Sequence, residues 1–148
     1  MQERFQNFTV LIAKISRSIR KIKTEEMDEF NLKSPHVSCL YYLYKSGPLT
    51  AKEICDICQE DKASISRSIE YLEKNDCIEC KSNLQKRYKS PLNLTKKGQI
   101  ISERIGQKID SILDLASVGL SDEERTILYK SLALISDNLE KICEKYGG

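Results

Sequence analysis

Two pairs of cysteines have the spacing that most directly suggests chemistry. Cys55 and Cys58 are separated by two residues, as are Cys77 and Cys80, and eighteen residues lie between the pairs. Four thiolates at such spacings can hold a structural Zn²⁺. A Cys-x-x-Cys pair can instead serve as a redox centre when its first thiol is exposed and acidified at the start of a helix.

The local sequence around these pairs favours ordinary core or surface thiols. Zinc-binding pairs usually lie in tight turns, whereas Cys55 and Cys58 fall inside an amphipathic stretch, and neither pair contains Gly or Pro. Alternation along a strand would place Cys77 and Cys80 on opposite faces. We expect no metal and no cofactor. A thiol- or zinc-dependent sensor built on these four cysteines is the alternative function.

Other catalytic chemistry is scarce in the sequence. His36 is the only histidine, and no serine or cysteine in its sequence context forms a nucleophile–base pair with it. It stands at a predicted helix start, with Ser34 as the N-cap and Pro35 at the first helical position. There is no Gly-rich phosphate loop. We therefore expect a protein that is not an enzyme.

A second set of residues could bind double-stranded DNA. Ile65, Ile69 and Leu72 predict a helix that buries one face. The polar side chains left exposed near its N-terminal end are Lys62, Ser64, Ser66 and Arg67. Small hydroxyls allow close approach to DNA, and an arginine can make a two-pronged contact to guanine in the major groove.

The segment that follows is strongly basic. Residues 81–97 carry six Lys or Arg and no acid, although the net charge of the chain is only +2. The cations expected to bind DNA in this segment are Lys86, Arg87 and Lys89. Arginine suits a narrow minor groove because its planar cation loses water more readily than lysine does. Ser38 and Thr50 are the expected phosphate contacts outside the segment.

The elements around these residues follow the order of a winged helix-turn-helix. Thr50 and Glu53 form a predicted capping box that opens one helix, whose inward side chains should be Ile54, Ile57 and Cys58. Residues 59–61 make a turn, and the polar helix opens at Asp61 or Lys62. Short strands at 77–81 and 91–94 flank the basic loop. This order predicts a mainly α fold with a small β-wing, in which two helices reach a major groove and the wing reaches an adjacent minor groove.

Long amphipathic helices are predicted on both sides of this module. Residues 4–24 place apolar side chains at spacings of three and four, and two such stretches follow the wing, interrupted at Gly119. Ser121 and Glu124 form a second predicted capping box at the start of the last stretch. Their apolar faces exceed what the central module needs, so a second copy of the chain is an expected partner. The predicted organisation is one domain over 1–148, with a DNA-binding lobe at 34–97 and dimerisation helices at 1–24 and 100–148.

The stretches PLTAKEI, DKASISRSIEYLEKNDCIE and LNLTKKGQ resemble the MarR family of bacterial transcriptional regulators. The matching features are Pro-Leu-Thr before the first motif helix, Ser-Arg within the second, Leu-Glu-Lys closing it, and Leu-Thr-x-x-Gly after the wing. The long flanking helices match that family's dimerisation helices. The resemblance implies a homodimer on a pseudo-palindromic operator, usually a repressor that a small ligand or thiol oxidation releases.

Two positions depart from the family's pattern. Gln85 stands where an aspartate usually steadies the wing arginine, and Asp76 stands where a glycine commonly ends the recognition helix. Aspartate can still adopt a left-handed backbone. A small organic effector would lie between the dimerisation helices and the winged module. Its candidate lining residues are His36, Tyr41, Tyr42 and Tyr44, although the tyrosines could equally serve in packing.

Composition predicts a globular protein, with 40% hydrophobic and 31% charged residues in a chain of 148. No apolar run approaches the roughly 18 residues of a membrane span, and no leader pattern opens the chain. Six cysteines in such a chain suit a reducing compartment. We expect a cytoplasmic protein without a membrane partner.

Overall fold

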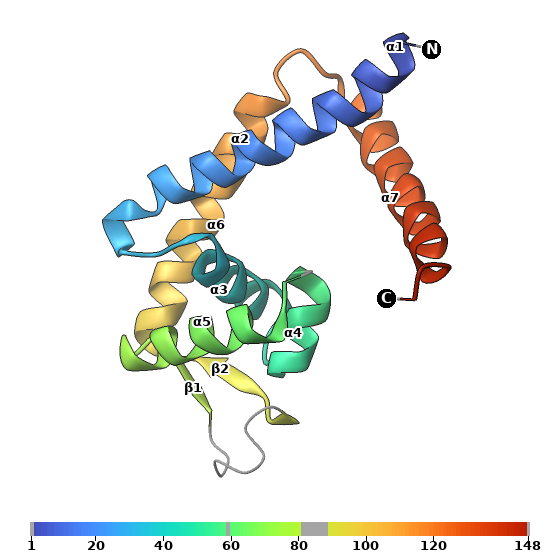
Figure 1. Cartoon of the computed structure of the whole chain (residues 1–148). Helices are drawn as coiled ribbons and strands as arrows, with labels where there is room; N and C mark the ends of the chain where they lie inside the picture. The colour runs from blue at the N-terminus through green and yellow to red at the C-terminus, as the bar shows by residue number, and fades with distance from the viewer. Residues whose placement is uncertain (1, 59, 81–88, 148) are drawn as a thin grey trace. The chain divides into compact units, whose positions relative to one another are not determined.

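The computed structural model describes residues 2–58, 60–80 and 89–147 (Figure 1). The chain divides into two compact units, Met1–Ile109 and Asp110–Gly148. The helical elements are α1 (Gln2–Phe5), η1 (Gln6–Val10), α2 (Leu11–Glu26), η2 (Asp28–Phe30), α3 (Ser34–Ser46), α4 (Ala51–Cys58), α5 (Lys62–Lys74), α6 (Lys96–Ala116) and α7 (Asp122–Glu144). The strands β1 (Ile78–Cys80) and β2 (Leu92–Leu94) form a small antiparallel sheet. The predicted mainly α fold with a small β-wing is confirmed.

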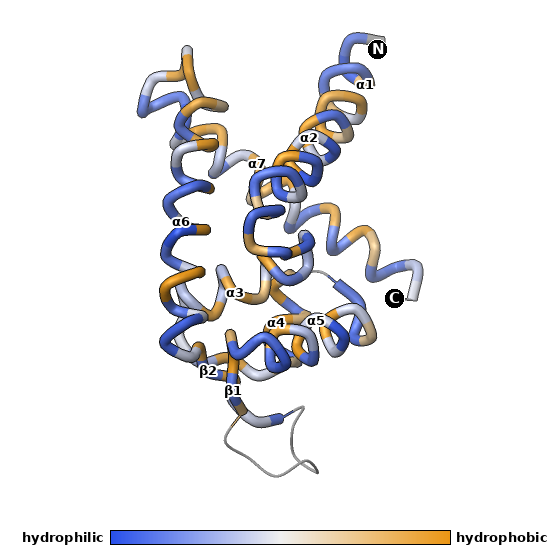
Figure 2. The backbone as a smooth tube through the Cα atoms, turned by 90° about the vertical axis from the view of Figure 1, so that its left-hand side faces the viewer, coloured by the Kyte–Doolittle hydropathy of each residue, from blue (hydrophilic) through white to orange (hydrophobic). Residues whose placement is uncertain are grey.

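The first unit begins with one continuous helical run made of α1, η1 and α2. The central segment, η1, is π-helical, and the residues that flank it keep helical backbone angles. This run covers the predicted helix at 4–24 and extends it slightly. No residue of α2, which is described throughout, is buried. Figure 2 shows hydrophobic positions recurring along this helix between hydrophilic ones.

Residues 27–32, which connect α2 to α3 and include Asp28 and Glu29, are anchored to the core. Met27 and Leu32 are only 1% and 5% exposed, although the segment between them is polar. A second anchor comes from α6, where the Lys108 ammonium lies 2.5 Å from a carboxylate oxygen of Glu29. The same ammonium lies over the ring of Phe30, 5.9 Å from its centroid. The connector is therefore a fixed part of the first unit.

Helices α3, α4 and α5 pack with the sheet around one hydrophobic core. Helix α5 packs against α3 and α4, and its predicted inward residues Ile65, Ile69 and Leu72 are at most 5% exposed. The buried residues of α3 are Val37, Cys39, Leu40 and Leu43. This packing leaves one side of α5 on the surface.

Two local predictions in this core are wrong. Ile57 was expected to face inward but is 42% exposed, because the buried face of α4 is centred on Ala51 and Ile54, roughly 90° away around the helix. The N-cap position of α3 is Lys33, since Ser34 is already helical. The capping acceptor at this helix start is the Nδ1 atom of His36, to which the Lys33 N–H donates at 3.0 Å.

The first turn of α6 lies directly against the entry to β1. A Cβ atom built on Gly98 would be 1.9 Å from the carbonyl oxygen of Cys77. The N–H of Thr95 donates to that same oxygen at 3.0 Å, and the Thr95 hydroxyl accepts from the Gly98 N–H at 3.0 Å. The Thr and Gly of the Leu-Thr-x-x-Gly sequence are thus the residues that join α6 to the sheet.

The second unit contains the end of α6, a turn and α7. Ser121 and Glu124 form the predicted capping box, with each backbone N–H donating to the other side chain at 2.8 and 3.1 Å. Gly119 lies in the turn between the helices with φ of 96°, a left-handed conformation that favours glycine. No helix in the described part of the chain has both the length and the apolar composition needed to cross a membrane.

Candidate nucleic-acid interface

Helix α5 holds the residues predicted to read bases. Its N-cap is Asp61, whose carboxylate accepts a hydrogen bond from the Ser64 N–H at 2.7 Å. The apolar side of α5 is buried, and Ser66 and Arg67 are exposed away from it. Lys62 is also exposed, in the first turn of the helix. By helical spacing it lies closer to the buried side than Arg67 does.

Ser64 differs from the other three because it is half-buried. Its N–H bonds to the Asp61 carboxylate, and its carbonyl accepts from the Ser68 hydroxyl at 3.0 Å. Its backbone is therefore committed to the start of the helix. Ser64 lies at the flank of the exposed surface, where only its hydroxyl could contact DNA.

The predicted phosphate contacts lie on α3 and just before α4. The Thr50 N–H donates to the Glu53 carboxylate at 2.8 Å, and the Glu53 N–H donates to the Thr50 hydroxyl oxygen at 3.1 Å. This arrangement confirms the capping box at residues 50–53. Because the Thr50 oxygen accepts in that pair, its hydroxyl proton can donate to a phosphate. Ser38 is half-buried on α3.

The two strands form the base of the wing. Ile78 pairs with Leu94 and Cys80 with Leu92, so the observed strands are slightly shorter than predicted. Lys89 is exposed just before β2. The other predicted wing contacts, Lys86 and Arg87, and the departure at Gln85 lie outside the described residues.

The C-terminal end of α5 is tied to the segment that follows the wing. Asp76 has φ of 61°, which confirms the predicted left-handed turn. Its carbonyl accepts from the Thr95 hydroxyl at 2.5 Å, and the carbonyl of Asn75 accepts from the Lys97 ammonium at 2.8 Å. These two bonds fix the base of the wing relative to the end of α5.

His36 connects the start of α3 to the last turn of α5. Its ring stacks on Tyr71 with centroids 4.2 Å apart and planes 8° from parallel. The Tyr71 hydroxyl in turn donates to the carbonyl of Asn31 at 2.6 Å. Burial, and to a smaller extent the positive charge of Lys33, lowers the pKa of His36 below its ordinary 6.5. Sequence reasoning missed this link because Asn31 and Tyr71 are forty positions apart.

The three tyrosines of α3 are half-buried. Tyr41 and Tyr42 meet edge to face with centroids 5.6 Å apart, and the Lys45 ammonium lies 5.7 Å from the ring centroids of both Tyr41 and Tyr44. The Tyr44 ring also faces Gly106 of α6, where a Cβ would be 3.5 Å away. These contacts serve packing within the first unit, and the lining of an effector site by these rings stays a prediction.

The environments of Cys39, Cys58 and Cys77 disfavour reactive thiolates. Burial raises the pKa of Cys39 to about 12 and that of Cys58 to about 11, and it also raises the pKa of Cys77. A reactive thiol needs the opposite shift, toward neutral pH. Among the described residues, no three His, Cys, Asp or Glu side chains are grouped so that they could hold a metal ion.

The capped helix pair, the exposed polar side of α5 and the strand-based wing together define a DNA-binding protein of the winged helix-turn-helix class. A sequence profile of the MarR family matches residues 30–87. The uncharacterized HTH-type transcriptional regulator YwoH of Bacillus subtilis (strain 168) is 30% identical over 110 residues, which are 74% of this chain and 80% of YwoH. The chain belongs to the MarR family of transcriptional regulators.

Solved structures of the family share this fold. A MarR family regulator from Listeria monocytogenes, complexed with a 26mer DNA, is 26% identical with a TM-score of 0.80, and the match covers 93% of each chain. Staphylococcus aureus MarR in complex with salicylate and kanamycin is 22% identical with a TM-score of 0.79, covering 95% of this chain and 92% of that one.

Proposed function

We propose that this regulator acts as a homodimer on a pseudo-palindromic operator and represses transcription by occupying it. The observation that carries the proposal is the pairing of two features in one chain. One is a polar, partly cationic surface on a capped recognition helix, and the other is a set of long helices with exposed apolar stripes. A two-fold dimer places two recognition helices on two half-sites, which suits an operator of the same symmetry.

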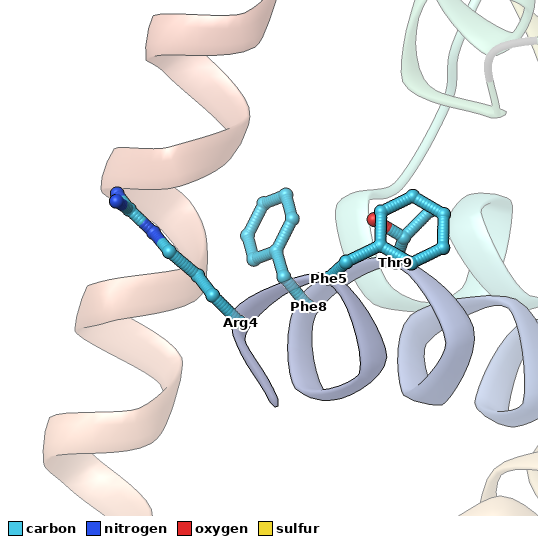
Figure 3. A pocket seen from close by; sticks show the side chains of 4 residues that line it. All are labelled: Arg4, Phe5, Phe8 and Thr9. Atoms are coloured by element: carbon cyan, nitrogen blue, oxygen red, sulfur yellow. The ribbon is translucent and has the colours of Figure 1, made fainter. Parts of the chain in front are cut away.

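The N-terminal helical run of α1, η1 and α2 carries an exposed apolar stripe. Its apolar side chains recur at alternating intervals of three and four, the spacing of a seam between packed helices. They are Phe5, Phe8, Ile12, Ile15, Ile19 and Ile22, all between 37% and 64% exposed. Figure 3 shows Phe5 and Phe8 beside Arg4 and Thr9, where the four side chains line an open hollow. Exposing a continuous apolar stripe of this length to water is unfavourable, so the stripe is expected to pack against another protein surface.

Helix α7 supports the same conclusion independently. Its apolar side chains also alternate at intervals of four and three, at Leu128, Leu132, Ile135, Leu139 and Ile142. Four of these five are between 41% and 48% exposed, and Ile135 is half-buried. We therefore assign dimerisation to 1–24 and 100–148, and DNA binding to the lobe at 34–97.

Each candidate DNA contact has a proposed role. Arg67 and Ser66 would contact base edges from α5, while Lys62 and Ser64 would contact bases or phosphates at its start. Thr50, Ser38 and Lys89 would contact the phosphate backbone, together with Lys86 and Arg87 of the wing. The Listeria regulator solved with a 26mer DNA supports this mode of use for the shared fold.

Release of the DNA by a small organic ligand is a further part of the proposal. The complex of Staphylococcus aureus MarR with salicylate motivates it, and the half-buried Tyr41, Tyr42, Tyr44 and His36 are the candidate contacts. The alternative, a sensor that uses the paired cysteines, finds no support in the raised pKa of Cys58 and Cys77.

Footprinting on the DNA upstream of the protein's own gene tests the operator. We expect a protected palindrome with one dimer bound, and protection without two-fold symmetry would contradict the proposal.

Sedimentation of Ile15→Lys tests the dimer, since a charge on the apolar stripe should produce monomers. Ala13→Lys is the matched control, because Ala13 is exposed on the other side of the same helix. A dimeric Ile15→Lys variant would overturn the assigned interface.

A further inference from the structure

The buried side of α5 defines which residues stand at the centre of its exposed face. Successive residues of an α-helix are about 100° apart, and the inward residues Ile65, Ile69 and Leu72 cluster around one direction. The side chains that point directly away from that direction are Ala63, Arg67, Glu70 and Lys74, all of them exposed. Ser66 lies beside this row of exposed side chains.

The spacing of this face matches that of base-reading positions. In the recognition helix of homeodomains, which are helix-turn-helix variants, the base-contacting residues stand at i, i+3, i+4 and i+7, and Ala63, Ser66, Arg67 and Glu70 have that spacing. Glu70 is therefore placed to meet base edges, one turn beyond Arg67.

A carboxylate in that place can accept a hydrogen bond from a base but not from a phosphate. Phosphates repel it, so it weakens binding to most sequences. The amino group of cytosine, however, presents a hydrogen-bond donor in the major groove that a glutamate can accept. Glu70 is three residues beyond Arg67, which is about 4.5 Å along the helix axis and comparable with one base-pair step of 3.4 Å.

We propose that Glu70 is a specificity-determining residue that accepts a hydrogen bond from a cytosine amino group in each half-site, next to the base pair contacted by Arg67. This inference rests on the proposed use of α5 as the recognition helix. Glu70 rejects other bases at that position and also lowers affinity for unrelated DNA. Both effects raise the ratio of specific to non-specific affinity.

The experiment uses the full-length protein and a library of operator DNA randomised across each half-site. We compare the wild type with Glu70→Ala, Glu70→Gln and Arg67→Ala. In Glu70→Ala, the preference for cytosine at one position should fall about tenfold, and affinity for unrelated DNA should rise a few-fold, on the order of two- to fivefold. In Glu70→Gln, the preference at that position should move from cytosine toward adenine, whose N6 and N7 an amide can pair with.

The control is Glu103→Gln, which removes one negative charge from an exposed position on α6 and should leave all base preferences unchanged. An unchanged cytosine preference in Glu70→Ala would overturn the role of Glu70 but leave the proposed function standing. So would a loss of preference at the same base pair that Arg67→Ala affects, because Glu70 would then act only by orienting Arg67. A wild type without any base preference would overturn the proposed function itself, and this assignment with it.

Discussion

The ring of His36 lies parallel to that of Tyr71, with 4.2 Å between the two centroids. Through this stack, the first turn of α3 is held against α5, and the Tyr71 hydroxyl continues the link to the carbonyl of Asn31 at 2.6 Å. The Nδ1 atom of His36 also accepts the Lys33 N–H, a bond that requires an unprotonated Nδ1. The neutral ring is thus part of the folded state.

This relationship predicts that acid destabilises the protein. The pKa of His36 is lower in the folded state than its ordinary 6.5, so the unfolded chain binds this proton more readily. Its contribution to the free energy of unfolding is therefore complete well above pH 6.5 and is lost as pH falls through 6.5 toward the folded pKa. Urea unfolding between about pH 7.5 and about pH 5.5 measures the loss. In His36→Gln the dependence over this range should flatten, and an equally steep dependence would contradict the assignment.

Gly98→Ala should destabilise the fold because the new Cβ would lie 1.9 Å from the backbone oxygen of Cys77. Overpacking of this kind costs about 1–3 kcal/mol or more. Gly106→Ala in the same helix is the control, since its Cβ would meet the Tyr44 ring at an ordinary 3.5 Å and alanine favours the helix by about 1 kcal/mol. Chemical denaturation compares the two variants. Equal stability of both would show that the contact at Gly98 relaxes without cost.

Arg67→Ala should weaken binding to the cognate operator by about 1–3 kcal/mol and relax base preference at one position in each half-site. Affinity for random DNA should change far less, because the proposed contact of Arg67 is to a base and not to a phosphate. Fluorescence anisotropy at one fixed salt concentration measures both affinities. Arg20→Ala is the control, since it removes the same charge from an exposed position on α2. Unchanged affinity of Arg67→Ala for both DNAs would refute the choice of recognition helix.

The thiols should react with iodoacetamide in an order set by exposure and pKa. Cys143 is exposed on α7 and should be alkylated first at about pH 8. Cys39, fully buried with a pKa of about 12, should stay unmodified until the protein unfolds. Peptide mass spectrometry follows each site with time, and the urea-denatured chain, in which all six cysteines should react, is the control. Early labelling of Cys39 would indicate that the core opens readily.

Local signals in the sequence predicted local structure well. The capping boxes at 50–53 and 121–124, the start of α5 at Asp61 or Lys62 and the left-handed Asp76 are all confirmed. Each depends on residues within one helical turn, so the information needed is contiguous. The buried side of α5 was equally readable, because its apolar residues repeat at helical intervals.

The failures involve contacts between segments that are distant in the sequence. Nothing near Met27 or Leu32 indicates that a stretch rich in acids is anchored in the core. The capping role of His36 and its stacking on Tyr71 depend on how α3 packs against α5. Ile57 was misplaced because α4 is short, and a single apolar repeat cannot define the centre of its buried face.

The anchored connector limits where the chain can be engineered. Residues 27–32 are hydrophilic enough to suggest a site for an epitope tag, but an insertion there would pull Met27 or Leu32 out of the core. The turn around Gly119 is the better choice, since Val118 and Gly119 are exposed. Among the described residues, and leaving aside its two chain neighbours, no heavy atom lies within 4 Å of where a Cβ on Gly119 would stand. A reporter placed in that turn leaves the packing of the first unit intact.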